Sequence, residues 1–137
     1  MDYPDPTATI VDAALCVHRH LGPGLLESTY EACLCHELSG RGLWVERQKP
    51  LPVAYCGVRV DCGYRVDLLV EGKVIIELKT VERFEPIHTA QLLTYLRLAR
   101  CAIGLLLNFN VVLMKDGIKR VVNNYQDPSS RPLRTLR

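Results

Sequence analysis

Two segments at the start of the chain place their apolar residues at helical spacing. Between residues 7 and 21 the apolar positions lie three and four apart, with Thr7 available as N-cap and Gly22-Pro23-Gly24 as a stop. A second helical pattern runs from about Leu26 to Leu38 and ends at Gly40-Arg41-Gly42. The sequence therefore predicts two helices before any strand.

Beyond residue 43 apolar and polar residues alternate and β-branched residues become common, which is typical of strands. Turn residues at Pro50, Cys56-Gly57 and Glu71-Gly72 interrupt this region. We therefore expect an antiparallel meander. Its expected strands are Trp44–Gln48, Leu51–Tyr55, Val58–Val60, Tyr64–Val70 and Val74–Lys79.

The second half of the chain adds a helix and further strands. Pro86 stands at the first position of a helix that apolar spacing extends to residue 100. The nearly continuous apolar run Ala102–Phe109 predicts a strand buried on both faces, as after a parallel crossover. Val111–Met114 and Ile118–Val122 flank a turn and predict two more strands.

These elements predict an α/β fold in which helices flank a mixed β-sheet, in the order helix, helix, β-meander, helix, strand. With 137 residues, 48% hydrophobic and 23% charged, the chain has the size and composition of one soluble domain. We assign residues 1–124 to this domain and residues 125–137 to a basic C-terminal tail. From residue 115 onward six Lys or Arg stand against two acidic residues, which permits contact with a polyanion.

The chain carries no signal for a membrane or for export. No apolar run approaches the ~20 residues that cross a bilayer. No basic residue precedes Arg19, so the features of a secretory signal are missing. We expect a cytoplasmic protein with no membrane partner, whose six cysteines are reduced and buried as small apolar side chains.

Three charged residues, Asp67, Glu77 and Lys79, interrupt two otherwise apolar strands. Glu77 and Lys79 are two apart and project from the same face of a strand. If Glu71-Gly72-Lys73 forms a three-residue loop, Asp67 lies opposite Glu77, close enough for the two carboxylates to share one cation. A two-residue turn would instead pair Asp67 with Ile76 and separate the carboxylates. A solvated Glu–Lys pair on a strand face would give the same pattern, so the alternatives stay open.

Two carboxylates, a backbone carbonyl and waters form the hard oxygen environment that suits Mg²⁺ or Mn²⁺. Such an ion lowers the pKa of a bound water and neutralises charge on a scissile phosphate. An ammonium beside it, here Lys79, can orient the water or stabilise the transferring phosphoryl group. The pattern is therefore compatible with a hydrolase that cleaves phosphodiesters with metal-activated water, as well as with the solvated strand face.

Further motifs accompany these three residues. Gly24, Glu27 and Tyr30 have the spacing G-x-x-E-x-x-Y. The others follow in consistent order over about residues 8–124: His18-Arg-His-Leu-Gly-Pro-Gly24, Asp67, Glu77-Leu-Lys79, Gln91-Leu-Leu-Thr-Tyr95 and Leu107-Asn-Phe-Asn110. This set resembles the GxxExxY family, which is assigned to the PD-(D/E)XK nuclease superfamily. The resemblance implies a restriction-endonuclease-like core and nuclease activity.

The resemblance also implies roles for the strand residues. Asp67 and Glu77 would be metal ligands together with the backbone carbonyl of Leu78, and Lys79 would be the catalytic lysine. Val66 stands where the superfamily's literal motif has proline, a substitution that the superfamily often shows.

Three helix residues complete the implied site. Glu27 would be the additional helix acid that many members of the superfamily bring to the metal. Gln91 and Tyr95 match the Q-x-x-x-Y pattern of exonuclease-like branches, and their spacing puts both on one helix face. Each also has a structural interpretation: Glu27 is favourable near a helix N-terminus, Gln91 suits a helix surface, and Tyr95 can be a packing residue.

We therefore expect a Mg²⁺- or Mn²⁺-dependent nuclease whose partner is nucleic acid, DNA or RNA. The alternative is a catalytically silent nuclease-like module that binds nucleic acid or a protein through its basic end. A homodimer stays open, since a small catalytic domain often uses a second copy to hold a long substrate. Zinc is not expected, because Cys33-Leu-Cys35-His36 has unsuitable spacing for one site and lacks a second cysteine pair.

Overall fold

The computed structural model describes residues 5–124, and two helices open the chain. They are α1 (Thr7–Leu21) and α2 (Glu27–Gly40), close to the predicted limits. The prediction that Thr7 caps α1 is wrong. The carboxylate of Asp5 instead accepts the backbone N–H of Thr7 at 2.8 Å, because Thr7 is already the first helical residue.

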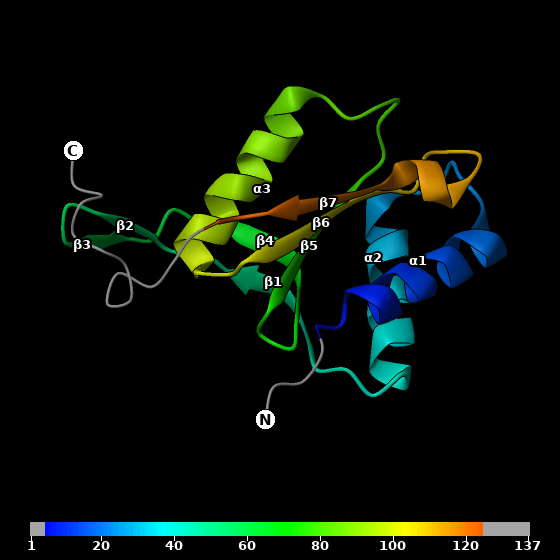
Figure 1. The fold of residues 1–137 in the computed structure, drawn as a ribbon, viewed down its shortest axis with the longest axis horizontal. Helices are drawn as coiled ribbons and strands as arrows, with labels where there is room; N and C mark the ends of the chain where they lie inside the picture. Colours follow the sequence, from blue (N-terminus) through cyan, green and yellow to red (C-terminus); the bar gives the residue numbers. More distant parts are fainter. Residues whose placement is uncertain (1–4, 125–137) are drawn as a thin grey trace.

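A five-stranded mixed sheet forms the centre of the fold, in the order β1-β4-β5-β6-β7 (Figure 1). Only β5 and β6 are parallel, and α3 (Pro86–Ala99) is the crossover between them. Pro86 lies at the start of α3, as predicted. The sheet strands are β1 (Val45–Pro50), β4 (Arg65–Val70), β5 (Val74–Lys79), β6 (Ile103–Asn108) and β7 (Ile118–Val122).

The strands before β5 do not form one continuous meander, which corrects the prediction. β1 pairs with β4, while β2 (Val53–Tyr55) and β3 (Val58–Val60) form a separate hairpin. The side chains of β2 and β3 are mostly exposed, so this hairpin has no buried face that would hold it within the sheet. It projects to one side of the molecule (Figure 1).

The predicted strand Val111–Met114 is also wrong. The chain there forms a bend and the 3₁₀ turn η1 (Met114–Gly117), and β7 pairs antiparallel with β6. Gly117 packs so closely on the end of β6 that a Cβ would collide with the carbonyl oxygen of Asn108. Val112 is largely exposed, so this apolar run lacks the buried face of a strand.

Helices cover both faces of the sheet and bury two sets of apolar side chains. One set lies between the sheet and the pair α1 and α2, and the other lies under α3 (Figure 1). β5 contributes to both, with Ile76 and Leu78 toward α1 and α2 and Ile75 toward α3. The α/β class and the mixed sheet flanked by helices are therefore confirmed.

Cysteine burial differs from the prediction. All six thiols are free, but only Cys101 is buried, while Cys56 and Cys62 are exposed around the β2–β3 hairpin. Within residues 5–124 no helix has the length and apolar character that crossing a membrane requires.

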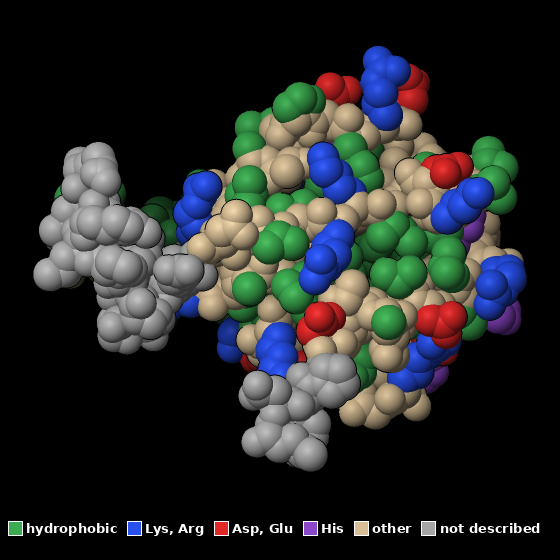
Figure 2. All heavy atoms as spheres, viewed as in Figure 1, with side chains coloured by type: hydrophobic (Ala, Val, Ile, Leu, Met, Phe, Trp, Pro, Cys, Tyr) green, Lys and Arg blue, Asp and Glu red, His purple; other side chains and the backbone are tan. Residues whose placement is uncertain are grey.

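Basic side chains are distributed rather than concentrated on the face seen in Figure 2, where they alternate with acidic and hydrophobic ones. Lys119 and Arg120, from the basic end of the chain, are exposed on β7. The predicted tail at residues 125–137, with Arg131, Arg134 and Arg137, lies outside the described residues.

Tyr30 joins α2 to the loop that precedes it. Its hydroxyl donates to the carbonyl of Gly22 at 2.5 Å and accepts the backbone N–H of Leu25 at 3.1 Å. Its ring is fully buried and stacks on Phe109 with centroids 4.6 Å apart. Tyr30 thereby fixes the loop from which Glu27 enters α2.

We predict that Tyr30→Phe lowers the free energy of unfolding by about 1–2 kcal/mol, because it removes both hydrogen bonds and keeps the stacked ring. Urea unfolding followed by circular dichroism measures the change. Tyr55→Phe is the matched control, since Tyr55 is 69% exposed on β2 and its loss should stay within about 0.5 kcal/mol. Equal stability of the two variants would contradict the role of Tyr30.

Candidate functional site

β4 and β5 are joined by a three-residue loop. Val70 pairs with Val74, Leu69 with Ile75 and Leu68 with Ile76, so the loop consists of residues 71–73. This register places Asp67 opposite Glu77 and confirms the three-residue alternative over the two-residue turn. The regular ladder stops there, since the next pair, Asp67 and Glu77, is not joined backbone to backbone.

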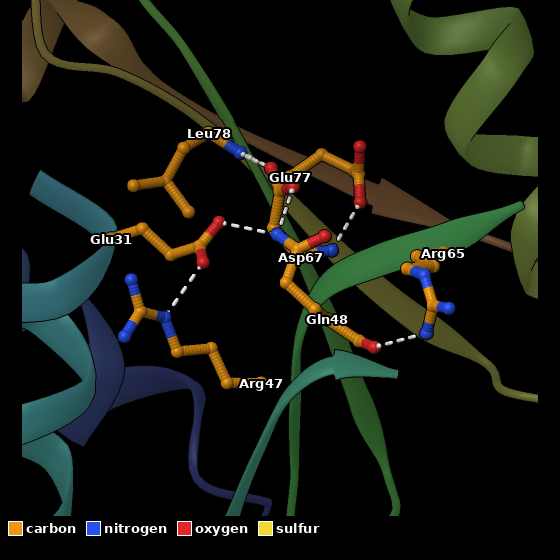
Figure 3. A network of polar contacts seen from close by, with 7 residues as sticks. All are labelled: Glu31, Arg47, Gln48, Arg65, Asp67, Glu77 and Leu78. Carbon is orange, nitrogen blue, oxygen red and sulfur yellow. Dashed lines mark hydrogen bonds and ion pairs between the residues drawn. The ribbon is translucent and has the colours of Figure 1, made fainter. Parts of the chain in front are cut away.

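Side chains replace the missing ladder at this point (Figure 3). The carboxylate of Glu77 accepts the backbone N–H of Asp67 at 2.9 Å, and the carboxylate of Asp67 accepts the backbone N–H of Leu78 at 2.8 Å. Each strand therefore uses a backbone N–H to hold the carboxylate of the other strand. The two carboxylates occupy the fork where β4 separates from β5.

The carbonyl of Leu78 belongs to the same fork. In a strand, the N–H and C=O of one residue point to the same side. The Leu78 N–H points to β4, where it meets Asp67, whereas the Lys79 carbonyl points to β6, where it accepts the Phe109 N–H. The Leu78 carbonyl consequently faces the two carboxylates.

The sequence interpretation missed two residues beside Asp67: Gln48, which donates to it, and Glu31, which accepts a hydrogen bond from Gln48. Gln48 lies opposite Asp67 on β1 with a left-handed φ of 52°, which interrupts the β1–β4 ladder. Its amide donates to Asp67 at 3.3 Å and to Glu31 of α2 at 2.8 Å (Figure 3). Glu31, only 6% exposed, also accepts a hydrogen bond from Arg47 at 2.8 Å.

One sequence signal for Glu31 was available. It is four residues after Glu27 and three before the buried Leu34, so a charge falls beside the apolar stripe of α2. Buried charges are generally paired, which makes such a position informative. For Gln48 no comparable signal exists, because a glutamine in an edge strand is ordinarily a surface residue.

The fork is an acidic, partly dry environment. Burial, with the neighbouring Asp67 charge, raises the pKa of Glu77 to about 8, although the Asp67 N–H and Lys79 oppose the rise. Burial also raises the pKa of Asp67, against the hydrogen bond from Leu78. Partial burial and the Asp67 charge raise the pKa of Glu27, against Lys79 and a backbone contact from Thr80. Glu27 and Lys79 therefore belong to the same electrostatic cluster as the two strand acids.

Asn108 fixes the segment that follows Lys79. It is 1% exposed at the end of β6, its amide donates to the Val81 carbonyl at 2.8 Å, and its oxygen accepts the Val81 N–H at 3.1 Å. The same oxygen accepts the Asn110 N–H at 3.0 Å. The motif around Asn108 thus anchors the chain just beyond the lysine.

Gln91 and Tyr95 of α3 line one side of a pocket with Tyr64, which precedes β4. The Tyr64 and Tyr95 rings are 6.4 Å apart between centroids. Burial, followed by the charge of Glu77, raises the pKa of Tyr95. The structure gives Gln91 an exposed position on this pocket rather than a direct contact with the acids.

The donor atoms at the fork fit a hard divalent cation. Asp67, Glu77 and the Leu78 carbonyl offer only oxygen atoms. The raised pKa of Glu77, about 8, means that too little positive charge lies nearby to stabilise its ionised form. Over residues 5–124, no three His, Cys, Asp or Glu side chains are arranged to hold a metal ion. A two-carboxylate set suits Mg²⁺, which keeps several waters.

Comparison with known protein families identifies the class of protein. A family model of the PD-(D/E)XK nuclease superfamily matches residues 4–121. The chain therefore belongs to the PD-(D/E)XK nuclease superfamily, as the resemblance implied. Nucleases of this superfamily generally use divalent metal ions and act on nucleic acid. No curated protein and no solved structure matches the chain.

We predict that the metal-free protein loses stability as pH rises from about 5 toward 8.5. The pKa of Glu77 is higher in the folded protein (about 8) than in the unfolded chain (near 4.5), so folding favours the protonated form and this contribution disappears as the folded group ionises. At pH 8.5, Glu77→Gln should stabilise the protein by about 1–3 kcal/mol, because it removes a poorly compensated buried charge. Urea unfolding in EDTA across this range measures both effects.

Glu46→Gln is the control for the dependence of the free energy of unfolding on pH. Lys49 donates to the Glu46 carboxylate and lowers its pKa, so Glu46 is ionised in both states above pH 6. Its variant should keep the slope of the parent protein. A slope unchanged by Glu77→Gln would contradict the electrostatics assigned to the fork.

Proposed function

We propose that this protein is a Mg²⁺- or Mn²⁺-dependent nuclease that hydrolyses phosphodiester bonds of nucleic acid, and that it is a GxxExxY member of its superfamily. The observation that carries the proposal is the reciprocal arrangement of Asp67 and Glu77 across the β4–β5 fork, with the Leu78 carbonyl facing them. These three groups would hold the ion. When bound, the ion would stabilise charge on the phosphate and lower the pKa of the attacking water.

Lys79 supplies the positive charge that the protein itself brings to the reaction. It lies two residues beyond Glu77 on β5 and lowers the pKa of Glu27, Asp67 and Glu77 by its charge. From there its ammonium would orient the water or hold a phosphate oxygen, and would stabilise the charge that grows in the transition state. The Asn108 contacts to Val81 support the chain that carries it.

The helix residues act in support. Glu27, at the first position of α2, lies near enough to Asp67 and Lys79 to interact electrostatically with both, and it would add an acid beside the ion. Gln91 and Tyr95 line a pocket with Tyr64 and would contact substrate there. A cytoplasmic location, a single domain over residues 1–124 and a homodimer remain predictions.

We predict that Asp67→Asn and Glu77→Gln abolish both Mn²⁺ binding and cleavage, because each removes a charged ligand. Lys79→Met should keep Mn²⁺ binding and lower cleavage by about 100-fold or more, because only the transition-state contact is lost. Calorimetric Mn²⁺ titration and cleavage of labelled single- and double-stranded DNA and RNA measure the two properties.

Asp116→Asn is the matched control, since it alters an exposed acid in η1 and should change neither property. Full cleavage by Lys79→Met would contradict the role of the lysine. Mn²⁺ binding without cleavage of any substrate would favour the catalytically silent module.

A further inference from the structure

A pocket of about 340 Å³ lies between α3 and the segments that lead into β2 and β4. It is where the C-terminal part of α3 approaches the β2–β3 hairpin (Figure 1). Its lining residues are Val53, Tyr64, Gln91, Thr94, Tyr95 and Leu98. The pocket thus combines an apolar floor, two tyrosine rings and two polar side chains.

The pocket is connected to the fork by a short chain of contacts. Tyr64 is followed by Arg65, whose guanidinium donates to the Gln48 carbonyl at 3.3 Å, and the Gln48 amide donates to Asp67 (Figure 3). Tyr64 also precedes Asp67 by only three residues of extended chain, so a group bound beside its ring would lie about 10 Å along the strand from the acids.

Tyr64 presents an aromatic ring at the surface, where the packing of the core does not require one. The side chain is 49% exposed, while its backbone is held by the Leu51 N–H, which donates to the Tyr64 carbonyl at 2.8 Å. The ring contacts Tyr95 at 55°, so Tyr95 supports it from one side. A planar ligand can then stack on the side of the ring that Tyr95 does not cover.

We propose that this pocket binds an unpaired nucleobase next to the cleaved phosphate, with Tyr64 as the stacking platform, so that the substrate is single-stranded or locally unpaired. The proposal rests on the nuclease function proposed above. Base–aromatic stacking tolerates any sequence, because every base has a π-face. Inside a duplex the faces of the bases are already stacked, so a base must leave the helix to reach Tyr64.

The polar residues around the ring suit a nucleotide. Gln91 carries donors and acceptors for the edge of a base, and the Thr94 hydroxyl, which donates to the Ala90 carbonyl at 3.1 Å, can still accept. Arg65 is exposed beside Tyr64 and uses one of its five N–H groups on Gln48, which leaves donors for a backbone phosphate. Acidic side chains are not among the residues that line the pocket.

The test uses the full chain carrying Lys79→Met, which slows cleavage, and an oligonucleotide containing the fluorescent base 2-aminopurine. Single strands of DNA and of RNA and the corresponding DNA duplex are titrated in Mg²⁺. We expect at least one single strand to bind about tenfold or more tightly than the duplex, with quenching of the fluorescent base. Adding Tyr64→Ala should remove the quenching and weaken single-strand binding about tenfold, while Tyr64→Phe should retain both.

Tyr55→Ala is the matched control, because Tyr55 is an exposed tyrosine of the β2–β3 hairpin that does not line the pocket. Quenching that persists in Tyr64→Ala, or duplex binding as tight as that of both single strands, would overturn the proposal. Circular dichroism verifies that the variants are folded.

Failure of this inference and failure of the nuclease function give different results. Cleavage that depends on Asp67, Glu77 and Lys79 but is equal on duplex and single strand, and indifferent to Tyr64→Ala, overturns the inference alone. Tyr64-dependent quenching in a protein without Mg²⁺-dependent cleavage supports the base pocket and overturns the nuclease function.

Discussion

The separation of β4 from β5 at Asp67 is the constraint on which the site depends. Further along the two strands a regular ladder satisfies the backbone, but at the fork the Asp67 and Leu78 N–H groups have no carbonyl partner from the opposite strand, and carboxylates accept them instead. The acids thus have a structural role, and the proposed function gives them a chemical role as well. They complete the hydrogen bonding of a diverging sheet and they converge on the gap that the divergence opens.

The two helical layers make this arrangement possible. α1 and α2 bury one face of β5 and α3 buries the other, so Glu77 lies in a strand that is dry on both sides. Its raised pKa is the electrostatic consequence. Gln48, itself held by Glu31 of α2, then donates to Asp67 from β1, while the charge of Glu31 adds to the negative charge around the fork. Preorganisation of this kind suits the metal-dependent hydrolysis proposed above.

Much of this could be predicted from the sequence, because the signals were local. Charged residues inside apolar strands singled out Asp67, Glu77 and Lys79, and the three-residue loop put the acids opposite each other. The pairing of the strands was harder to predict, because the alternation of apolar and polar residues does not identify the partner of a strand. The exposed β2–β3 hairpin also has the same pattern as a strand of the sheet. Gln48 could not be foreseen, since its role depends on Glu31, 17 residues away, and on a left-handed φ. The strand predicted at Val111–Met114 was wrong because an apolar run does not guarantee a buried face.

The most direct measurement is a crystal structure of the protein grown with Mn²⁺, with anomalous diffraction used to locate the ion. The account predicts one strong anomalous peak in the β4–β5 fork, within about 2.0–2.3 Å of oxygens from Asp67, Glu77 and the Leu78 carbonyl, with waters completing the shell. A fork without anomalous density at saturating Mn²⁺, or an ion held only by other residues, would contradict it.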